Sequence, residues 1–314
     1  MTMTDLATAG PATQAAPSGP AATRGTRRRR RVPAAPYLMI APFFLSFIAF
    51  GAYPLLFALR LSFTNWQGSG ELRWIGLGNY TYLLTSSDFW ASLANSGVMW
   101  LLVVPVQTLG AVAIAAALSQ RRLRGRGFFR TTLIVPFVTP LIAMAQVWLL
   151  LFDADFGAVN SFLKTLGLPS VGWLTTTVWA KPTIALLVLW KTTGFAIVIM
   201  LAAIQNIPDD VYEAAAIDGA GTWHRFWSIT VPLMRRAIAF YVVIATLGIS
   251  QMFAEPYVMT KGGPYNSTIT SGLFLYNHIT TSDLGLGSAN SFLLVLLVFL
   301  LSLVSVRLLR SKED

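Results

Sequence analysis

The chain has 314 residues, of which 55% are hydrophobic and only 11% are charged, and its formal net charge is +10. Since an ordinary soluble domain carries roughly 25% charged residues, this composition argues against a soluble fold and predicts an integral membrane protein. The absence of cysteine excludes disulfides, thiolate metal sites and cysteine nucleophiles, and the two histidines, His224 and His278, lack the spacing of a zinc site, so no metal site is predicted.

Residues 1–35 differ in composition from the rest of the chain. They are rich in Ala, Pro, Thr and Gly and contain the basic run Arg27–Arg31. Because such a composition cannot bury a core, we predict a disordered, basic cytoplasmic tail. The apolar run that follows, about 37–59, is longer than the roughly 7–15 residues of a cleaved signal peptide core, which favours a retained membrane helix. Residues 36–91 then form the first transmembrane helix and its outer segment.

Six stretches reach the roughly 20 mostly apolar residues that cross a bilayer, which predicts an all-α fold of six transmembrane helices. The stretches are 37–63, 93–119, 129–152, 180–205, 236–259 and 288–309. The fifth contains Gln251 and Glu255 near its end. Pro105, Pro136 and Pro140 are expected to kink the second and third spans.

The basic residues orient these helices. Most of the 23 lysine and arginine residues fall in four segments on one side of the predicted topology: the N-terminal tail, the 121–130 loop, the 206–235 loop and the C-terminal end. Because positively charged loops stay inside, we predict a multi-pass protein of the cell membrane with both termini in the cytoplasm. The basic charge is expected to meet anionic membrane lipid, and it does not predict binding of nucleic acid.

The 206–235 loop is the longest predicted cytoplasmic segment after the tail, and it predicts two short helices joined by a glycine turn. Asn206 and Pro208 suit the start of the first helix, and Gly219 and Gly221 suit its end.

The second helix of this loop is expected to be capped by Thr222 and ended by Pro232. Residues at i, i+3, i+4 and i+7 share one face: Trp223, Phe226, Trp227 and Thr230. The residues alone leave two interpretations open. The loop is either a lever joined to two membrane helices or an amphipathic segment that lies against lipid headgroups.

The stretch EAAAIDGAGTWHRFWSITVPLMRR, which begins at Glu213, resembles the EAA signature of permease subunits in binding-protein-dependent ABC importers. That signature is Glu-Ala-Ala, two residues, Asp-Gly-Ala, then an aromatic-bearing helix and a proline. The matching positions are Glu213, Ala214, Ala215, Asp218, Gly219, Ala220, Phe226, Ile229 and Pro232. The family often has a second proline four residues later, where this chain has Arg236.

Three further segments are similar to sugar permeases: GLGNY (76–80), KGGPYNST (261–268) and DLGLGSA (283–289). The Gly-Gly-Pro version is characteristic of the first permease subunit of maltose-transporter-type and glycerol-phosphate-transporter-type systems. The resemblance extends over about 37–310. It implies a type I ABC importer permease fold in which residues 92–310 are the transmembrane core, including the coupling loop.

The resemblance also implies a division of labour between subunits. The coupling helix that docks on a cytoplasmic ABC ATPase would comprise Glu213, Ala214, Ala215, Asp218, Gly219 and Ala220. The implied partners are a second permease subunit, two copies of the ATPase and an extracytoplasmic substrate-binding protein. No lysine of this chain follows a phosphate-cradling glycine loop, so ATP and Mg are expected on the partner ATPase, and the chain is expected to hold no cofactor or catalytic residue and not to be an enzyme.

Polar residues inside the predicted spans are candidates for a translocation pathway. Lys191 lies near the midplane of the fourth span, where a charge usually faces a cavity or a partner, although a structural pair or a snorkelling side chain are alternatives. The other candidates are Trp190, Gln146, Gln251 and Glu255. Gln107 and Asn95 are equally explained as hydrogen-bonding links between helices.

The favoured function is ATP-driven import of a mono-, di- or oligosaccharide or a polyol by alternating access. Import of a glycerol phosphate ester is an alternative because of Lys191. An ion-coupled secondary transporter is less favoured, because no Asp or Glu falls near a predicted midplane. A membrane-embedded enzyme would need a site such as Asp153 and Asp155, which are better explained as solvated loop residues.

Overall fold

The structure is a computed structural model that describes residues 35–119 and 125–310. The predicted disordered tail, apart from Ala35, lies outside the described residues, as does part of the 121–130 loop. The chain divides into two compact units between Gly51 and Ala52. The segment boundaries predicted at residues 36 and 92 stay predictions.

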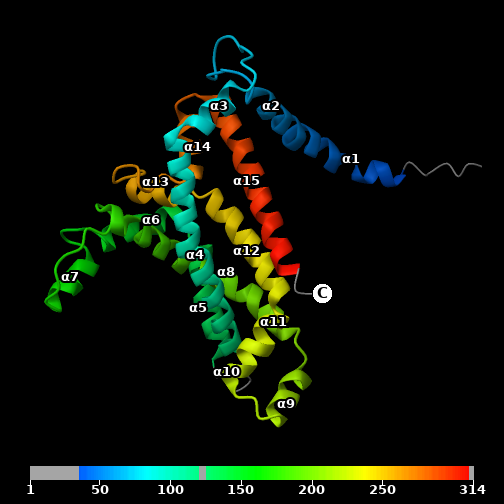
Figure 1. Ribbon diagram of the computed structural model, residues 1–314, viewed down its shortest axis with the longest axis vertical. Helices are drawn as coiled ribbons and strands as arrows, with labels where there is room; N and C mark the ends of the chain where they lie inside the picture. The colour runs from blue at the N-terminus through cyan, green and yellow to red at the C-terminus, as the bar shows by residue number, and fades with distance from the viewer. Residues whose placement is uncertain (1–34, 120–124, 311–314) are drawn as a thin grey trace, which may run out of the picture. The chain divides into compact units, whose positions relative to one another are not determined.

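Regular structure in the described residues is helical, and the extended backbone forms one isolated antiparallel bridge, between Thr64 and Trp74. The elements are α1 (Ala35–Phe47), η1 (Ile48–Ala52), α2 (Tyr53–Leu61), α3 (Gly78–Thr85), α4 (Ser87–Ser119), α5 (Arg126–Val138), α6 (Leu141–Leu151), α7 (Ala158–Thr165), α8 (Thr177–Gln205), α9 (Asp209–Ile217), α10 (Thr222–Arg225), η2 (Phe226–Thr230), α11 (Val231–Leu233), α12 (Arg235–Ser250), α13 (Ala254–Thr260), α14 (Ser271–Thr280) and α15 (Leu284–Arg310) (Figure 1). The predicted all-α fold is confirmed.

Four helices are long and apolar enough to cross a membrane: Leu38–Leu61, Ser87–Ser119, Thr177–Gln205 and Leu284–Leu303. Two bent helix pairs also pass this test, one bent by 96° and the other by 68°. If each bent pair is one span, the described residues supply up to six, which agrees with the predicted number.

The third predicted span is broken at Pro140. Helices α5 and α6 meet there at 96°, and Thr139 is extended, with ψ of 142°. Proline lacks an N–H and disfavours helical backbone at the residue before it, so the helix ends at Val138 and restarts at Leu141. The expected kink is confirmed at Pro140, whereas Pro136 lies inside α5.

The fifth predicted span, 236–259, is wrong in its second half. Helix α12 ends at Ser250, and α13 begins only at Ala254. Non-helical backbone at membrane depth needs protein partners for its polar groups. The start of α14 supplies them, because the Thr270 hydroxyl donates to the Met252 carbonyl and the Ser271 hydroxyl donates to the Ser250 carbonyl at 3.0 Å.

The two halves of this broken span share α8 as a neighbour but differ in their main contacts. Helix α12 packs mainly against α4 and α15, whereas α13 packs mainly against α6. The break therefore joins two segments whose main supports differ.

The core of the larger unit is built on α4 and α8, which pack together along their lengths. Small and branched apolar residues interdigitate between them, including Val103, Val104, Leu187 and Ile197. Helix α5 crosses α8 at Gly194, where a Cβ would lie only 1.9 Å from the Leu133 carbonyl oxygen. Glycine is thus required at this crossing.

We expect Gly194→Ala to destabilise the purified chain by about 3 kcal/mol, because α5 must move away from α8 to admit one methyl group. The matched control is Gly110→Ala in α4, where a new Cβ meets no atom within 4 Å. That control should be about 1 kcal/mol more stable than the parent, from helix propensity alone. Thermal unfolding in detergent measures both, and equal midpoints for the two variants would contradict the close crossing.

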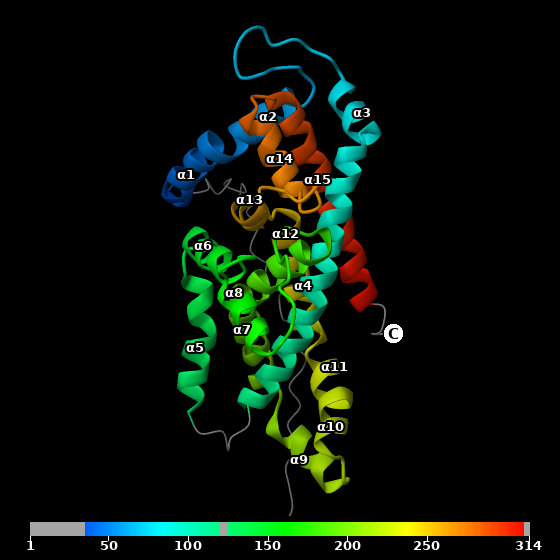
Figure 2. The same cartoon turned by 90° about the vertical axis from the view of Figure 1, so that its left-hand side faces the viewer.

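The two ends of the larger unit carry different segments. Helices α3 and α14 lie at one end, and the helices of the 206–235 loop, α9 and α10, lie at the other (Figures 1 and 2). The long helices α4 and α8 run between these ends. The loop predicted to be cytoplasmic is therefore well separated from the segments around α3 and α14 that are predicted to be outer.

Candidate functional site

The 206–235 loop forms two short helical segments joined by a tight turn, as the sequence predicts. Helix α9 ends at Ile217, and Gly219 adopts φ of +78°. The Gly219 N–H donates to the Ala216 carbonyl at 3.1 Å, and the Ala220 N–H donates to the Ala215 carbonyl at 2.9 Å. This pair of bonds is a Schellman motif, which needs a left-handed residue at its corner. We call residues 209–221 the coupling elbow.

The predicted helix caps in this loop are wrong. Asn206 is the C-cap of α8, and its side-chain amide donates to the Ala202 carbonyl at 3.1 Å. Pro208 is the N-cap of α9 and offers no side-chain acceptor. Thr222 is the first residue of α10, after Gly221, and makes no side-chain cap. Because α8 extends through Gln205, Asn206 belongs to the end of the preceding helix.

Pro232 does not end the second segment. It lies in the first turn of α11, where its missing N–H is tolerated, and the 68° bend falls between Leu233 and Arg235. The predicted aromatic face is confirmed, because Trp223, Phe226 and Trp227 contact one another with ring centroids 5.1 to 6.3 Å apart.

The six predicted ATPase-coupling residues occupy one elbow but differ in exposure. Glu213, Ala214, Asp218 and Gly219 are exposed, Ala215 is buried, and Ala220 is half-buried. A hollow of about 530 Å³ inside the elbow is lined by Ala215, Asp218, Gly219, Ala220, Gly221, His224 and Ile229. The elbow therefore presents carboxylates outward from a closed turn.

Two features of the elbow were not predicted from the sequence. Ile217 is 86% exposed at its tip, which is unusual for a large apolar side chain beside two exposed acids. The Tyr212 hydroxyl lies 3.1 Å from the Thr230 hydroxyl and braces α9 against η2. The exposure of Ile217 could have been predicted from its position directly before Asp218 and Gly219, which form the turn. The Tyr212 contact could not, because it depends on how the turn folds back on η2.

A second candidate site is a cavity of about 460 Å³ in the middle of the bundle. Its walls come from α4, α5, α8, α12 and α13 and are mostly apolar. The polar lining residues are Gln107, Thr192, Tyr241, Gln251 and Glu255. A mostly apolar cavity with a few convergent polar groups is typical of a small-molecule site.

Three of the five predicted pathway residues lie at or beside this cavity. Gln251 and Glu255 line it, and the Lys191 Nζ lies 5.7 Å from the ring centroid of Phe137, another lining residue. Lys191 and Glu255 also interact electrostatically. The structure thus places Lys191 over an aromatic face at the edge of the cavity.

The other two pathway candidates do not line this cavity. Trp190 contacts Trp148, with ring centroids 5.9 Å apart, and Gln146 is exposed on α6. Their roles in a pathway stay predictions.

Two polar lining residues were not among the pathway candidates. These two residues are Thr192 and Tyr241. Gln107, which the sequence explains equally well as an interhelical link, lines the cavity and also links two helices. Its side-chain amide donates to the Thr192 hydroxyl at 2.5 Å. Thr192 follows Lys191 directly, so the two adjacent polar residues in the middle of a span could have indicated that Thr192 lines a cavity. Asn95 links α4 to the loop before α14 and not to another helix, because its side-chain amide donates to the Asn266 and Ile269 carbonyls.

Residues 107–312 match the family described as binding-protein-dependent transport system inner membrane component. The chain is 35% identical over 283 residues to the lactose transport system permease protein LacF of Rhizobium radiobacter, a match that covers 88% of this chain and 94% of that protein. It is 33% identical over 279 residues to the trehalose/maltose transport system permease protein MalF of Thermococcus litoralis, again with coverage of 88% and 94%.

Solved structures share the fold. A bacterial ABC transporter involved in the import of the acidic polysaccharide alginate contains a chain that superposes with a TM-score of 0.75 at 22% identity, covering 89% of this chain and 96% of that one. A second structure of an alginate ABC transporter, in complex with an alginate pentasaccharide-bound periplasmic protein, gives 0.74 at 23% identity. The family match spans the coupling elbow and all lining residues of the bundle cavity except Val103. The chain therefore belongs to the binding-protein-dependent inner membrane components and is a multi-pass permease subunit of an ABC importer, with the type I permease fold.

Proposed function

We propose that this subunit translocates a carbohydrate across the cell membrane by alternating access, driven by ATP hydrolysis on a partner ATPase. The observation that carries the proposal is the coupling elbow, a closed turn that presents Glu213, Ile217 and Asp218 at the end of the bundle. Only Asn206–Pro208 separate the elbow from α8, so a force on the elbow passes directly to a long helix of the core. Rigid-body motion of this kind is a common basis of alternating access.

The proposed assembly contains a second permease subunit, two ATPase copies that bind ATP and Mg, and an extracytoplasmic substrate-binding protein. The similar alginate transporter was solved with a periplasmic protein bound, which supports the last of these partners. We place the elbow, and with it both termini, on the cytoplasmic side, because the basic residues gather there.

A carbohydrate suits the bundle cavity better than an anion does. The cavity offers amide and hydroxyl groups from Gln107, Thr192, Tyr241 and Gln251, together with aromatic side chains such as Phe137. Glu255 lines the same space, so a phosphate ester would meet a carboxylate. Relatives named for the transport of lactose and of trehalose/maltose support a mono-, di- or oligosaccharide, with a polyol or glycerol phosphate ester as the alternatives.

We expect uptake of the substrate to collapse when cellular ATP is depleted while the proton gradient is kept. A deletion strain complemented with the gene, screened with radiolabelled sugars, polyols and glycerol 3-phosphate, identifies the substrate and provides the assay. An uncoupler that removes the gradient but spares ATP is the control and should leave uptake unchanged. The reverse pattern would indicate an ion-coupled secondary transporter, for which Glu255 would be the first residue to test.

A further inference from the structure

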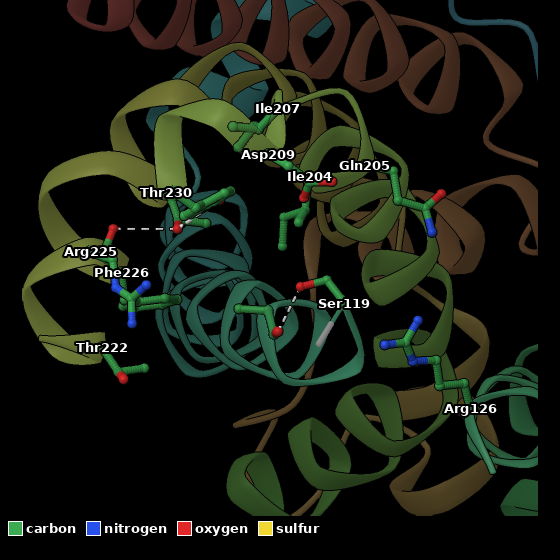
Figure 3. A pocket seen from close by; sticks show the side chains of 12 residues that line it. Ser119, Arg126, Ile204, Gln205, Ile207, Asp209, Thr222, Arg225, Phe226 and Thr230 are labelled. Carbon is green, nitrogen blue, oxygen red and sulfur yellow. Dashed lines mark hydrogen bonds between the residues drawn. The ribbon is translucent and has the colours of Figure 1, made fainter. Parts of the chain in front are cut away.

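A third cavity, of about 700 Å³, lies beside the coupling elbow where α4, α5, α8, α9, α10 and η2 converge. It is distinct from the bundle cavity, since the two share no lining residue. Figure 3 shows two arginines on opposite sides of it, Arg126 from α5 and Arg225 from α10. The function proposed above assigns it no role.

Several donors on these arginines lack partners. The Arg126 Nε and Nη2 and the Arg225 Nε are buried and form no hydrogen bond within the described part of the chain. A buried charged donor without an acceptor is unfavourable, which indicates that an acceptor from outside the described residues completes the site.

The other polar groups of the cavity are mostly engaged. The hydroxyls of Tyr212 and Thr230 lie 3.1 Å apart, and the Ser119 hydroxyl donates to the Ala116 carbonyl at 2.8 Å. The Asp209 carboxylate also lines the cavity and has an interaction of its own. The unsatisfied groups are therefore cationic donors, which favour an anion with several acceptor oxygens.

Exposed aromatic side chains flank both arginines. In α5, Arg126 is followed by Phe128, which is 71% exposed, and Phe129, and in the other wall Arg225 lies between Trp223, which is 74% exposed, and Trp227. Exposed aromatic side chains next to basic ones are typical of the headgroup layer of a membrane. Basic pockets between membrane helices on the cytoplasmic side bind anionic headgroups.

We propose that this cavity binds a phosphate group between Arg126 and Arg225, and that the phosphate belongs to an anionic phospholipid. A soluble phosphate compound would present the same oxygens, and the experiment separates the two sources. The proposal concerns a regulatory or structural ligand and does not depend on which solute is transported.

Titration of the delipidated full-length chain with phosphatidylglycerol and phosphatidylcholine of matched acyl chains, followed by native mass spectrometry, tests the proposal. We expect tighter binding of phosphatidylglycerol, weakened about fivefold in Arg126→Gln and about fivefold in Arg225→Gln. The matched control is Arg130→Gln, which removes the same charge from an exposed position of α5 outside the cavity and should leave the affinity within about twofold.

Wild-type protein provides a readout that no variant can compromise. In nanodiscs with and without phosphatidylglycerol, the anionic lipid should slow hydrogen exchange at the start of α5 and in α10 and η2. Glycerol 3-phosphate or inorganic phosphate that binds with the same dependence on both arginines would identify a soluble ligand of the same site. Equal affinity for the two lipids, or equal losses in all three arginine variants, would overturn the proposal.

Discussion

Substitution of Gly219 by proline is expected to reduce uptake to background and to release the partner ATPase from the membrane. Gly219 adopts φ of +78°, whereas proline fixes φ near −65°, so the Schellman turn cannot form. The substitution also removes the N–H that donates to Ala216. Without the turn, the angle at which Asp218 and Ile217 are presented is lost, and closure of the ATPase no longer moves α8.

The neighbouring glycine offers a matched control for this experiment. Gly221 has an ordinary extended conformation, and a Cβ added at either Gly219 or Gly221 would meet no atom within 4 Å, so a loss at Gly219 reflects the backbone and not a clash. Gly221→Ala should transport like the parent, and Gly219→Asn should retain part of the activity because Asn tolerates the left-handed region. Radiolabelled uptake and co-purification of the ATPase measure the effect. Full uptake in Gly219→Pro would refute the role of the elbow.

Substitution of Lys191 by methionine is expected to lower uptake per inserted chain about a hundredfold. Lys191 lies over Phe137 at the bundle cavity, and Glu255 lines the same cavity, so removal of the ammonium group takes away the positive charge nearby that favours the ionised carboxylate. A single uncompensated charge at membrane depth costs about 3 kcal/mol, which corresponds to this factor. Uptake kinetics normalised to the amount of protein in the membrane provide the measurement.

A double variant separates charge compensation from direct contact with the substrate. If the two charges mainly offset each other, Lys191→Met combined with Glu255→Gln should recover most of the uptake lost in the single variant. Lys181→Met is the control, because it makes the same change in α8 far from the cavity, and it should have an effect of less than about twofold. A double variant as inactive as Lys191→Met would mean that the ammonium group itself acts on the solute.

Most of the structure that was predicted correctly follows from long apolar runs, which form the long helices, and from the glycine turn at Gly219. Helices α4, α8 and α15 agree closely with their predicted spans, since their apolar residues are continuous and little competes with a helix in lipid. The break after Ser250 was not predicted. Its cause is non-local, because the free carbonyls at the break accept hydrogen bonds from the hydroxyls of Thr270 and Ser271, which lie about 20 residues farther along the chain.

The candidate sites were predictable to different degrees. The turn at Gly219 follows from local chemistry, as only glycine adopts the left-handed conformation readily. The cap at Asn206 was misassigned because its side chain bonds back to the end of α8, and the cap at Thr222 was misassigned because α10 already begins at that residue. The bundle cavity depends on the rotation of each helix about its axis, which places Lys191 beside the cavity and leaves Trp190 outside its lining.

The interrupted fifth crossing has a consequence for how the solute route could open. Both pieces contact α8, but α12 packs mainly against α4 and α15 and α13 mainly against α6, and the three residues between them, Gln251–Phe253, form part of the wall of the bundle cavity. A shift of α6 relative to α4 can therefore be absorbed by changes in the backbone dihedral angles of Gln251–Phe253, while the hydrogen bonds within α12 and α13 stay intact. Spin labels on α12 and α13 should report a change of separation between resting and ATP-bound assemblies, while labels placed within α12 alone keep theirs.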